Sequence, residues 1–191
     1  MIALFTQVAL AGWTEDVAAS VAACAADPTP CEAVAGLGLR PTRAGHLVAQ
    51  DPRLYDPAVT GPLIHRLLTD PDPAVRAGLA DGLARALLDR PDPTWHTAWA
   101  DLAATHPDVA VRSVLIASLR RAPIEAAGPG LRGALRHAEP VTRGDAAAAM
   151  GGHADAKAFV PDLLVASEDT DPRVRALVAR ALDWAGRVHR P

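Results

Sequence analysis

The sequence predicts an all-α fold, an α-α superhelix built from about five helical hairpins. A short pattern that ends in arginine recurs four times, at Arg76, Arg112, Arg143 and Arg175, with nearly constant spacing. Such intervals lie within the range of about 20–50 residues that is typical of repeat proteins. Half of the 191 residues are apolar but only 4% are aromatic, so closely stacked helices with small side chains suit this composition better than one bulky core. Strand-forming residues show no sustained alternation.

Each copy of the pattern indicates where the second helix of a hairpin begins. The first residue is acidic and suits an N-cap, because its carboxylate can accept hydrogen bonds from the free N–H groups of the first turn. Proline follows in three copies, and it loses no hydrogen bond at the start of a helix. The four copies start at Asp72, Asp108, Glu139 and Asp171.

An apolar stripe follows each start and predicts the buried face of the second helix. Apolar or small residues stand one position before the arginine and three, four and seven positions after it, which is the spacing of an amphipathic helix. The four stripes are Val75, Leu79, Ala80 and Leu83; Val111, Leu115, Ile116 and Leu119; Thr142, Ala146, Ala147 and Met150; and Val174, Val178, Ala179 and Leu182.

A first helix precedes each second helix. Proline stands in or near its first turns at Pro62, Pro129 and Pro161, where it would start or bend the helix. The connections, at 69–72, 105–108, 137–139 and 168–171, are short and polar. Short connections make the two helices of each pair antiparallel neighbours.

The N-terminal part predicts a degenerate capping repeat and insert over 12–54, ahead of the clear repeats at 55–186, in one domain spanning 1–191. Thr14 can cap a helix that runs to about Ala26. Terminal repeats are expected to be atypical, because their outer face meets water. Residues 1–11 are a candidate signal peptide, although no basic residue precedes their apolar run.

The run from Pro62 to Arg76 resembles the HEAT-repeat pattern, in the form shared with phycobilisome-lyase-type HEAT-like repeats, and the run from Val160 to Leu182 repeats it. The resemblance covers 55–186. The third unit departs from it at Trp95, His96 and Trp99, and the fourth at 128–130, where Gly-Pro-Gly should loosen the first helix. The resemblance implies a helical solenoid that serves mainly as a scaffold or binding surface.

The two cysteines, Cys24 and Cys31, lie at a spacing that suits a disulfide across the turn of a helical hairpin, and free, partly buried thiols are the alternative. Two thiols without a nearby histidine do not complete a zinc site. A disulfide and a signal peptide support each other, which favours an exported or periplasmic location over the cytoplasm. No later segment approaches the length of an apolar membrane span.

The net charge of the chain indicates which kind of partner it favours. The chain carries 22 acidic residues against 19 basic ones, for a net charge of -3. Nucleic-acid binders usually have a basic surplus, so nucleic acid is an unfavoured partner and a protein or peptide is favoured. No nucleophile motif or phosphate-binding glycine loop occurs, and the sequence predicts no catalytic residues, no metal and no cofactor.

The acidic residues and arginines of the repeat form a set of charged side chains that could be taken for catalytic residues. Stacked repeats place each acid near its neighbour's equivalents, where N-capping and ion pairing explain it better than catalysis does. His106 and His137 occupy matching positions in two turns. We expect both to be exposed turn residues rather than metal ligands.

Trp95 and Trp99 are four residues apart and share one helix face. Two interpretations stay open. They fill volume in a core that is poor in large side chains, or they anchor a partner, because tryptophan often dominates interface energies.

The outward positions of the second helices predict the binding surface. These positions are small and fairly apolar, with a few residues that reach outward. The candidate partner-binding residues are Arg85, Val114, Arg121, Leu177, Arg180 and Trp184. The sequence therefore predicts a non-catalytic interaction scaffold that binds a peptide or protein on its concave helix face. The alternative is a HEAT-like enzyme such as an alkyl-base DNA glycosylase or a bilin lyase, to which Trp95, Trp99 and Asp101 would contribute.

Overall fold

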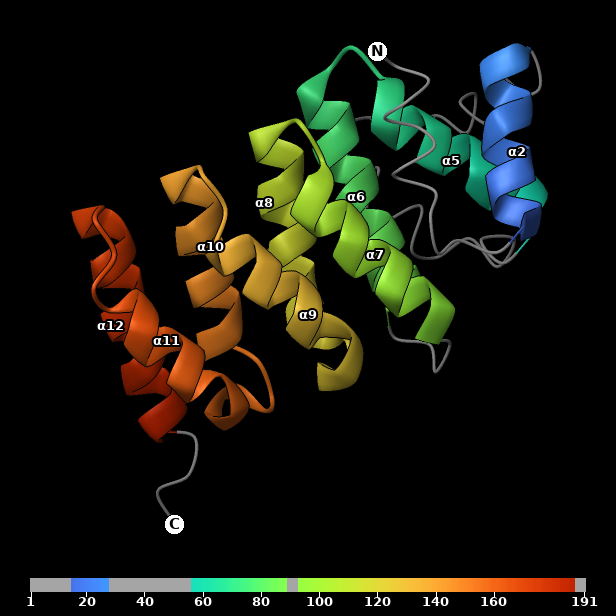
Figure 1. Ribbon diagram of the computed structural model, residues 1–191. Coiled ribbons are helices and arrows are strands. Elements are labelled where there is room, and N and C mark those ends of the chain that lie inside the picture. Colours follow the sequence, from blue (N-terminus) through green and yellow to red (C-terminus); the bar gives the residue numbers. More distant parts are fainter. Residues whose placement is uncertain (1–14, 28–55, 89–92, 188–191) are drawn as a thin grey trace. The chain divides into compact units, whose positions relative to one another are not determined.

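The computed structural model describes residues 15–27, 56–88 and 93–187, and every regular element in these ranges is a helix (Figure 1). The helices pack in neighbouring pairs, the arrangement from which helical-repeat solenoids are built. The predicted all-α fold of helical hairpins is therefore confirmed. In the part of the chain that is described, no helix is long and apolar enough to cross a membrane.

Contacts divide the chain into two compact units, residues 1–98 and 99–191, although the sequence predicts a single domain. The first unit contains α2 (Glu15–Ala26), α5 (Pro57–Thr69), α6 (Pro73–Leu87) and the start of α7 (Pro93–Thr105). The helix predicted to end near Ala26 is thus present. α2 packs against α5, and α5 packs against α6. Gly61 permits the first contact, because a Cβ there would lie 2.3 Å from the hydroxyl oxygen of Ser20.

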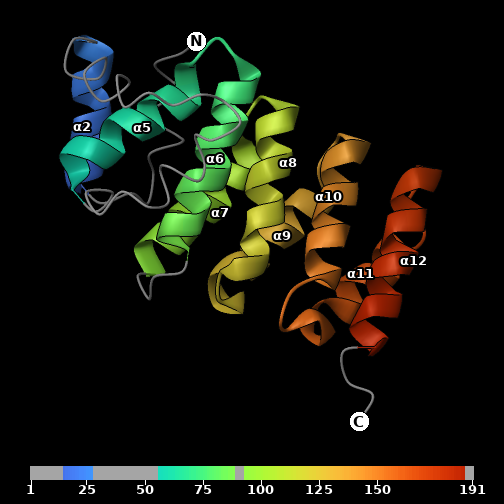
Figure 2. The ribbon, with the colours of Figure 1, turned by 180° about the vertical axis from the view of Figure 1, so that it is seen from behind.

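The second unit contains the rest of α7, then α8 (Val109–Ser118), the short 3₁₀ helix η2 (Leu119–Arg121), α9 (Ile124–Leu135) and α10 (Pro140–Gly151). The 3₁₀ helix η3 (Ala156–Phe159), α11 (Val160–Ala166) and α12 (Pro172–Arg187) complete it. α9 pairs with α10 and α11 with α12, while α10 also packs against both α8 and α12. Seen from behind, α8, α10 and α12 lie side by side (Figure 2).

The predicted helix starts are confirmed where the acid is aspartate. Asp72 accepts a hydrogen bond from the N–H of Ala74 at 2.8 Å, and Asp108 accepts one from Ala110 at 2.9 Å. Asp171 does the same with the N–H of Arg173 at 2.7 Å. Glu139 is different, since its side chain makes no capping hydrogen bond and forms an ion pair with Arg112 instead. The prediction that Glu139 caps α10 is therefore wrong, because its longer side chain reaches the preceding repeat.

The predicted stripes form the core in α6, in α8 with the first residue of η2, and in α10, where all twelve of their residues are buried. In α12 Val174 and Val178 are buried, but Ala179 is exposed and Leu182 is half-buried. Ala181 and Ala185 are buried in their place. The difference follows from the packing, because the described helices cover α12 only on the side of α10 and α11.

The Gly-Pro-Gly run at 128–130 was expected to loosen the first helix of its repeat, yet α9 continues through it with Pro129 inside the helix. Gly130 is buried, and a Cβ added there would lie 2.8 Å from the Cβ of Ala100 in α7. The glycine therefore allows α9 to approach α7 closely, and this packing keeps the segment helical.

Several predictions lie outside the described residues. These are the candidate signal peptide at 1–11, most of the insert at 28–54, and Cys31. Cys24 is described: it is 4% exposed and disulfide-bonded. Burial of Cys24 among the apolar residues of α2 agrees with a structural role for this bond.

Candidate partner-binding surface

The repeat arginines close the hairpin turns by hydrogen bonding to backbone carbonyls. Arg112 donates through Nη1 to the carbonyl of His106 at 2.5 Å, and Arg143 to that of His137 at 2.9 Å. Arg175 donates to the carbonyl of Asp169 at 2.7 Å, and Arg76 makes the same contact with Asp70. In each case the carbonyl lies six residues before the arginine. The contact recurs because every repeat needs the same turn to be closed.

The residue that supplies this carbonyl also holds the turn through its side chain. Asp70 and Asp169 each accept the backbone N–H two residues ahead, at 2.9 and 2.8 Å. Nδ1 of His106 and of His137 accepts the equivalent N–H at 3.1 and 3.0 Å. Aspartate and histidine are interchangeable here because both present an acceptor at the same reach.

His106 is only 1% exposed, and His137 is half-buried. The expectation that both are exposed turn residues is therefore wrong for His106. A histidine that accepts a turn hydrogen bond points back toward the chain rather than into solvent. Within residues 15–27, 56–88 and 93–187, no group of three or more His, Cys, Asp or Glu side chains is arranged to hold a metal ion.

The same arginines also join consecutive repeats of the second unit. Arg112 donates through Nε to Thr142 at 2.9 Å and pairs with Glu139, while Arg143 pairs with Asp169. The hydrogen bond from Arg143 is the main cause that lowers the pKa of the Asp169 carboxyl from its ordinary value. The charged groups of Arg112 and Arg143 thus pair with residues of the neighbouring repeat, which supports a structural role for the acid and arginine pattern.

Trp99 is fully buried, and its indole Nε1 donates a hydrogen bond to the hydroxyl of Ser118 at 2.9 Å. It therefore fills the core between α7 and α8 and presents no surface to a partner. Trp95 is half-buried, in the other unit. Asp101 is exposed, and partial burial raises the pKa of its carboxyl. Trp99 thus lies in the core, whereas Asp101 lies at the surface.

The outward sides of α8, α10 and α12 form the candidate surface, which we call the second-helix face (Figure 2). It contains five of the predicted binding residues, namely Val114, Arg121, Leu177, Arg180 and Trp184. Val114 and Leu177 are half-buried, and the other three are exposed. At the corresponding positions the middle helix, α10, has Asp145 and the small residues Ala148, Ala149 and Gly152. Arg85 lies in the other unit and forms an ion pair with Asp81 at 2.9 Å.

Trp184 lines a small pocket on this face. The pocket has a volume of about 90 Å³ and is lined by Ala148, Leu177, Arg180, Ala181 and Trp184. The Trp184 side chain is 43% exposed, and the guanidinium of Arg180 lies over its ring at 5.8 Å from the centroid. Leu177 packs where a Cβ on Gly144 would be, at 2.7 Å, so glycine in α10 makes room for it.

Arginines border the face on both sides of α10. The Cδ of Arg120 lies 2.9 Å from the position that a Cβ on Gly152 would take, so this side chain covers the end of α10. Arg121 and Arg180 are exposed, and none of the three arginines forms an ion pair with a described residue. If α8 continued as an α-helix, its periodicity would place Arg120 off this face. Instead α8 ends at Ser118, and the 3₁₀ helix η2 rotates each residue further than an α-helix does, which brings Arg120 onto the face.

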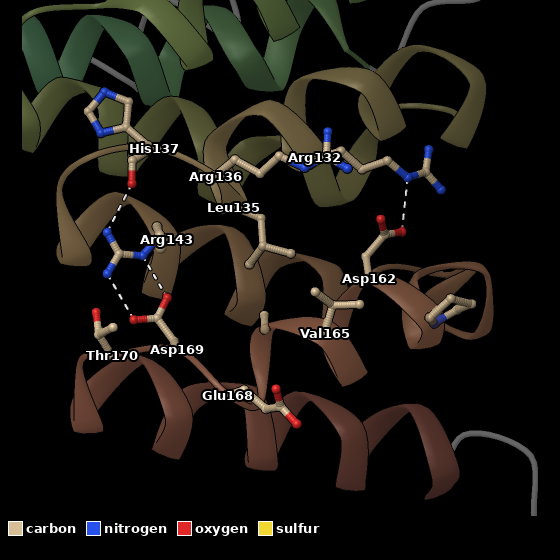
Figure 3. Close-up of a pocket in the computed structure, with 12 residues that line it drawn as sticks. Arg132, Leu135, Arg136, His137, Arg143, Asp162, Val165, Glu168, Asp169 and Thr170 are labelled. Carbon is tan, nitrogen blue, oxygen red and sulfur yellow. Dashed lines mark hydrogen bonds and ion pairs between the residues drawn. The ribbon is translucent and has the colours of Figure 1, made fainter.

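A larger pocket, which the sequence did not indicate, lies on the side of α9 and α11. Its volume is about 670 Å³, and Figure 3 shows an ion pair at each end, Arg132 with Asp162 and Arg143 with Asp169, and Leu135 and Val165 between them. The pairs join α9 to α11 and α10 to the turn before α12. Most of the charge in this pocket is therefore neutralised by contacts within the fold. Residues of α9, α10, α11 and the turn before α12 line this pocket.

Comparison of the chain with protein-family models, with curated proteins and with solved structures finds no match. The geometry of the described residues is therefore the basis for a functional assignment.

Proposed function

We propose that this chain is a non-catalytic interaction module, a HEAT-like helical repeat that binds a peptide or protein segment on its second-helix face. The main support is Trp184, a large aromatic side chain that is 43% exposed beside a pocket lined by apolar and small residues. Exposed tryptophan at a pocket is typical of the anchors that dominate the energy of protein interfaces.

The small residues of α10 also support this face. Ala148 projects little from the helix, so a partner can approach closely there between the longer side chains of α8 and α12. A surface that is already formed by packed helices binds with little ordering cost. The resemblance to HEAT-like repeats agrees with such a role, because the family serves mainly as scaffolds.

The pocket between α9 and α11 supports the proposal less well, although it is larger. Arg132 is already paired with Asp162 and Arg143 with Asp169, so a ligand that displaced either pair would leave a charge unpaired. The enzymatic alternative relied on Trp95, Trp99 and Asp101. Burial of Trp99 leaves it without a specific observation in its favour.

A selection from a library of random displayed peptides tests the proposal. Peptides enriched on the wild-type chain should bind Trp184→Ala about tenfold more weakly or worse, because the anchor is removed. Val165→Ser is the matched control, since Val165 is 79% exposed on α11 and lies off the second-helix face. It should leave affinity unchanged.

The proposal is overturned if no peptide is enriched, or if every enriched peptide binds Trp184→Ala as tightly as the wild type. Because Trp184 is partly exposed, its replacement should leave the fold intact, and circular dichroism and thermal melting verify this for both variants.

A further inference from the structure

The charge on the second-helix face points to the chemistry of the partner. We propose that the segment bound there is acidic and carries an aliphatic side chain that enters the pocket beside Trp184. This inference rests on the proposed function and specifies the ligand of the same face.

The first observation is a group of three arginines on the second-helix face. Arg120 and Arg121 lie at the end of α8 and η2, and Arg180 lies across α10 from them on α12. None forms an ion pair with a described residue. Arg120 uses Nε to bond the carbonyl of Ala117 at 3.1 Å, which leaves its Nη groups available.

Two carboxylates near this group already have partners within the chain, while Glu125, four residues after Arg121, is exposed and forms no ion pair with a described residue. Asp145 of α10 accepts a hydrogen bond from the hydroxyl of Ser113 at 2.5 Å, one helical turn before Ala148. Asp183 pairs with Arg187 at 2.6 Å. None of these three carboxylates forms an ion pair with Arg120, Arg121 or Arg180 in the described part of the chain, so the arginines can pair with carboxylates of a bound segment even though the whole chain has a net charge of -3.

The second observation is the size and lining of the Trp184 pocket. The pocket has a volume of about 90 Å³ and a mostly apolar lining, which suits a small aliphatic side chain. Ala148, Leu177 and Ala181 line the pocket together with Arg180 and Trp184. An apolar side chain would gain burial there without leaving a polar atom unpaired.

The arginines and the pocket lie close enough for one short segment to use both. Arg180 lines the pocket itself and stands over the Trp184 ring, and Arg120 covers Gly152, one helical turn after the pocket residue Ala148. A segment with acidic residues on either side of one leucine or valine would place its carboxylates beside arginines on both sides of α10. Bidentate arginine–carboxylate hydrogen bonds would then add to the affinity and fix the orientation.

The test repeats the peptide selection on two charge-reversed chains. Peptides enriched on the wild type should contain aspartate or glutamate around a leucine, valine or isoleucine, and their affinity should fall as salt is raised. The double variant Arg120→Glu with Arg180→Glu should bind them about tenfold more weakly or worse, and should itself enrich peptides that are rich in lysine and arginine. Arg136→Glu is the matched control, because Arg136 is exposed beside the other pocket and should not alter the selection.

Two outcomes contradict the inference while the proposed function stands. One is enrichment on the wild type of neutral or basic peptides that still lose affinity with Trp184→Ala. The other is displacement of an enriched acidic peptide by an oligothymidylate strand at lower concentration than by the peptide itself, which would assign the arginines to a nucleic acid. By contrast, loss of all binding that depends on Trp184 would remove the proposed function as well.

Discussion

Arg143 donates two hydrogen bonds to Asp169 across the boundary between consecutive hairpins, from Nε at 2.7 Å and from Nη2 at 2.8 Å. Both side chains are largely buried, with 14% and 11% exposed. The same guanidinium also bonds the carbonyls of His137 and Ala138. The Arg143 side chain therefore closes its own turn and holds the next repeat, while the turn contact alone is common to all four repeat arginines.

The first prediction is that Arg143 and Asp169 are energetically coupled. Arg143→Met and Asp169→Asn should each lower the free energy of unfolding by about 1–3 kcal/mol, and the double variant should cost less than their sum. Asn keeps the acceptor for the N–H of Asp171, so the turn itself is preserved. Urea unfolding of the four chains of the cycle measures the coupling.

The pair Asp183 and Arg187 is the matched control for this cycle, because its side chains are 53% and 68% exposed. Exposed ion pairs contribute about 0–1 kcal/mol. Equal coupling energies for the two pairs would contradict the role of Arg143 as a link between repeats.

The second prediction concerns how the free energy of unfolding depends on pH. Arg143 lowers the pKa of the Asp169 carboxyl below its ordinary value of 3.8, so the unfolded chain takes up this proton first as pH falls. Asp169 therefore contributes stability above pH 3.8, and this contribution is lost as pH falls through the folded-state pKa. Unfolding free energies measured from pH 7 to pH 3 should fall less steeply for Asp169→Asn than for the wild type. An identical slope for both chains would be evidence against the linkage.

The third prediction follows from the interchange of histidine and aspartate in the turns. His137→Asp should change the free energy of unfolding by less than about 0.5 kcal/mol, because aspartate accepts the equivalent N–H at Asp169. His137→Ala removes the acceptor and should cost about 0.5–1.5 kcal/mol. Thermal melting of both variants compares them, and equal losses would mean that the imidazole contributes by packing instead.

The fourth prediction concerns the disulfide at Cys24. The intact mass of the chain should rise by two hydrogen masses on reduction, and reductant should lower the melting temperature of the wild type, because a cross-link restricts the unfolded chain. Cys24→Ser should melt at the same temperature with and without reductant. If reductant leaves the melting temperature of the wild type unchanged, the disulfide does not stabilise the fold.

The sequence predicted the second helices well, because local chemistry determines where they begin. Asp72 and Asp108 cap their helices through contacts only two residues away, and the buried stripes follow from helical spacing alone. Glu139 and Ala179 were missed because their surroundings come from other repeats. Glu139 reaches Arg112 of the preceding hairpin, and Ala179 lies on a side of α12 that no described helix covers.

The candidate surface was predicted in outline, and its details were not. Leu177, Arg180 and Trp184 are brought together as expected, since they share one helix face. Arg120 was missed because the change from α-helix to 3₁₀ helix after Ser118 turns it onto this face. The sequence did not decide whether Trp99 lies in the core or at the surface, because its hydrogen-bond partner, Ser118, is far away in the sequence. The pocket between α9 and α11 depends on contacts between first helices, which carry the weaker pattern.

The most direct test of the account is to observe the indole N–H resonance of Trp184 in ¹H–¹⁵N spectra during titration with an enriched acidic peptide. Trp184→Phe assigns the signal, since only four tryptophans are present. The account predicts that this resonance shifts or broadens together with amides of α8, α10 and α12, while those around Leu135 and Val165 stay unchanged. A Trp184 signal that remains fixed while resonances of α9 and α11 move would contradict it.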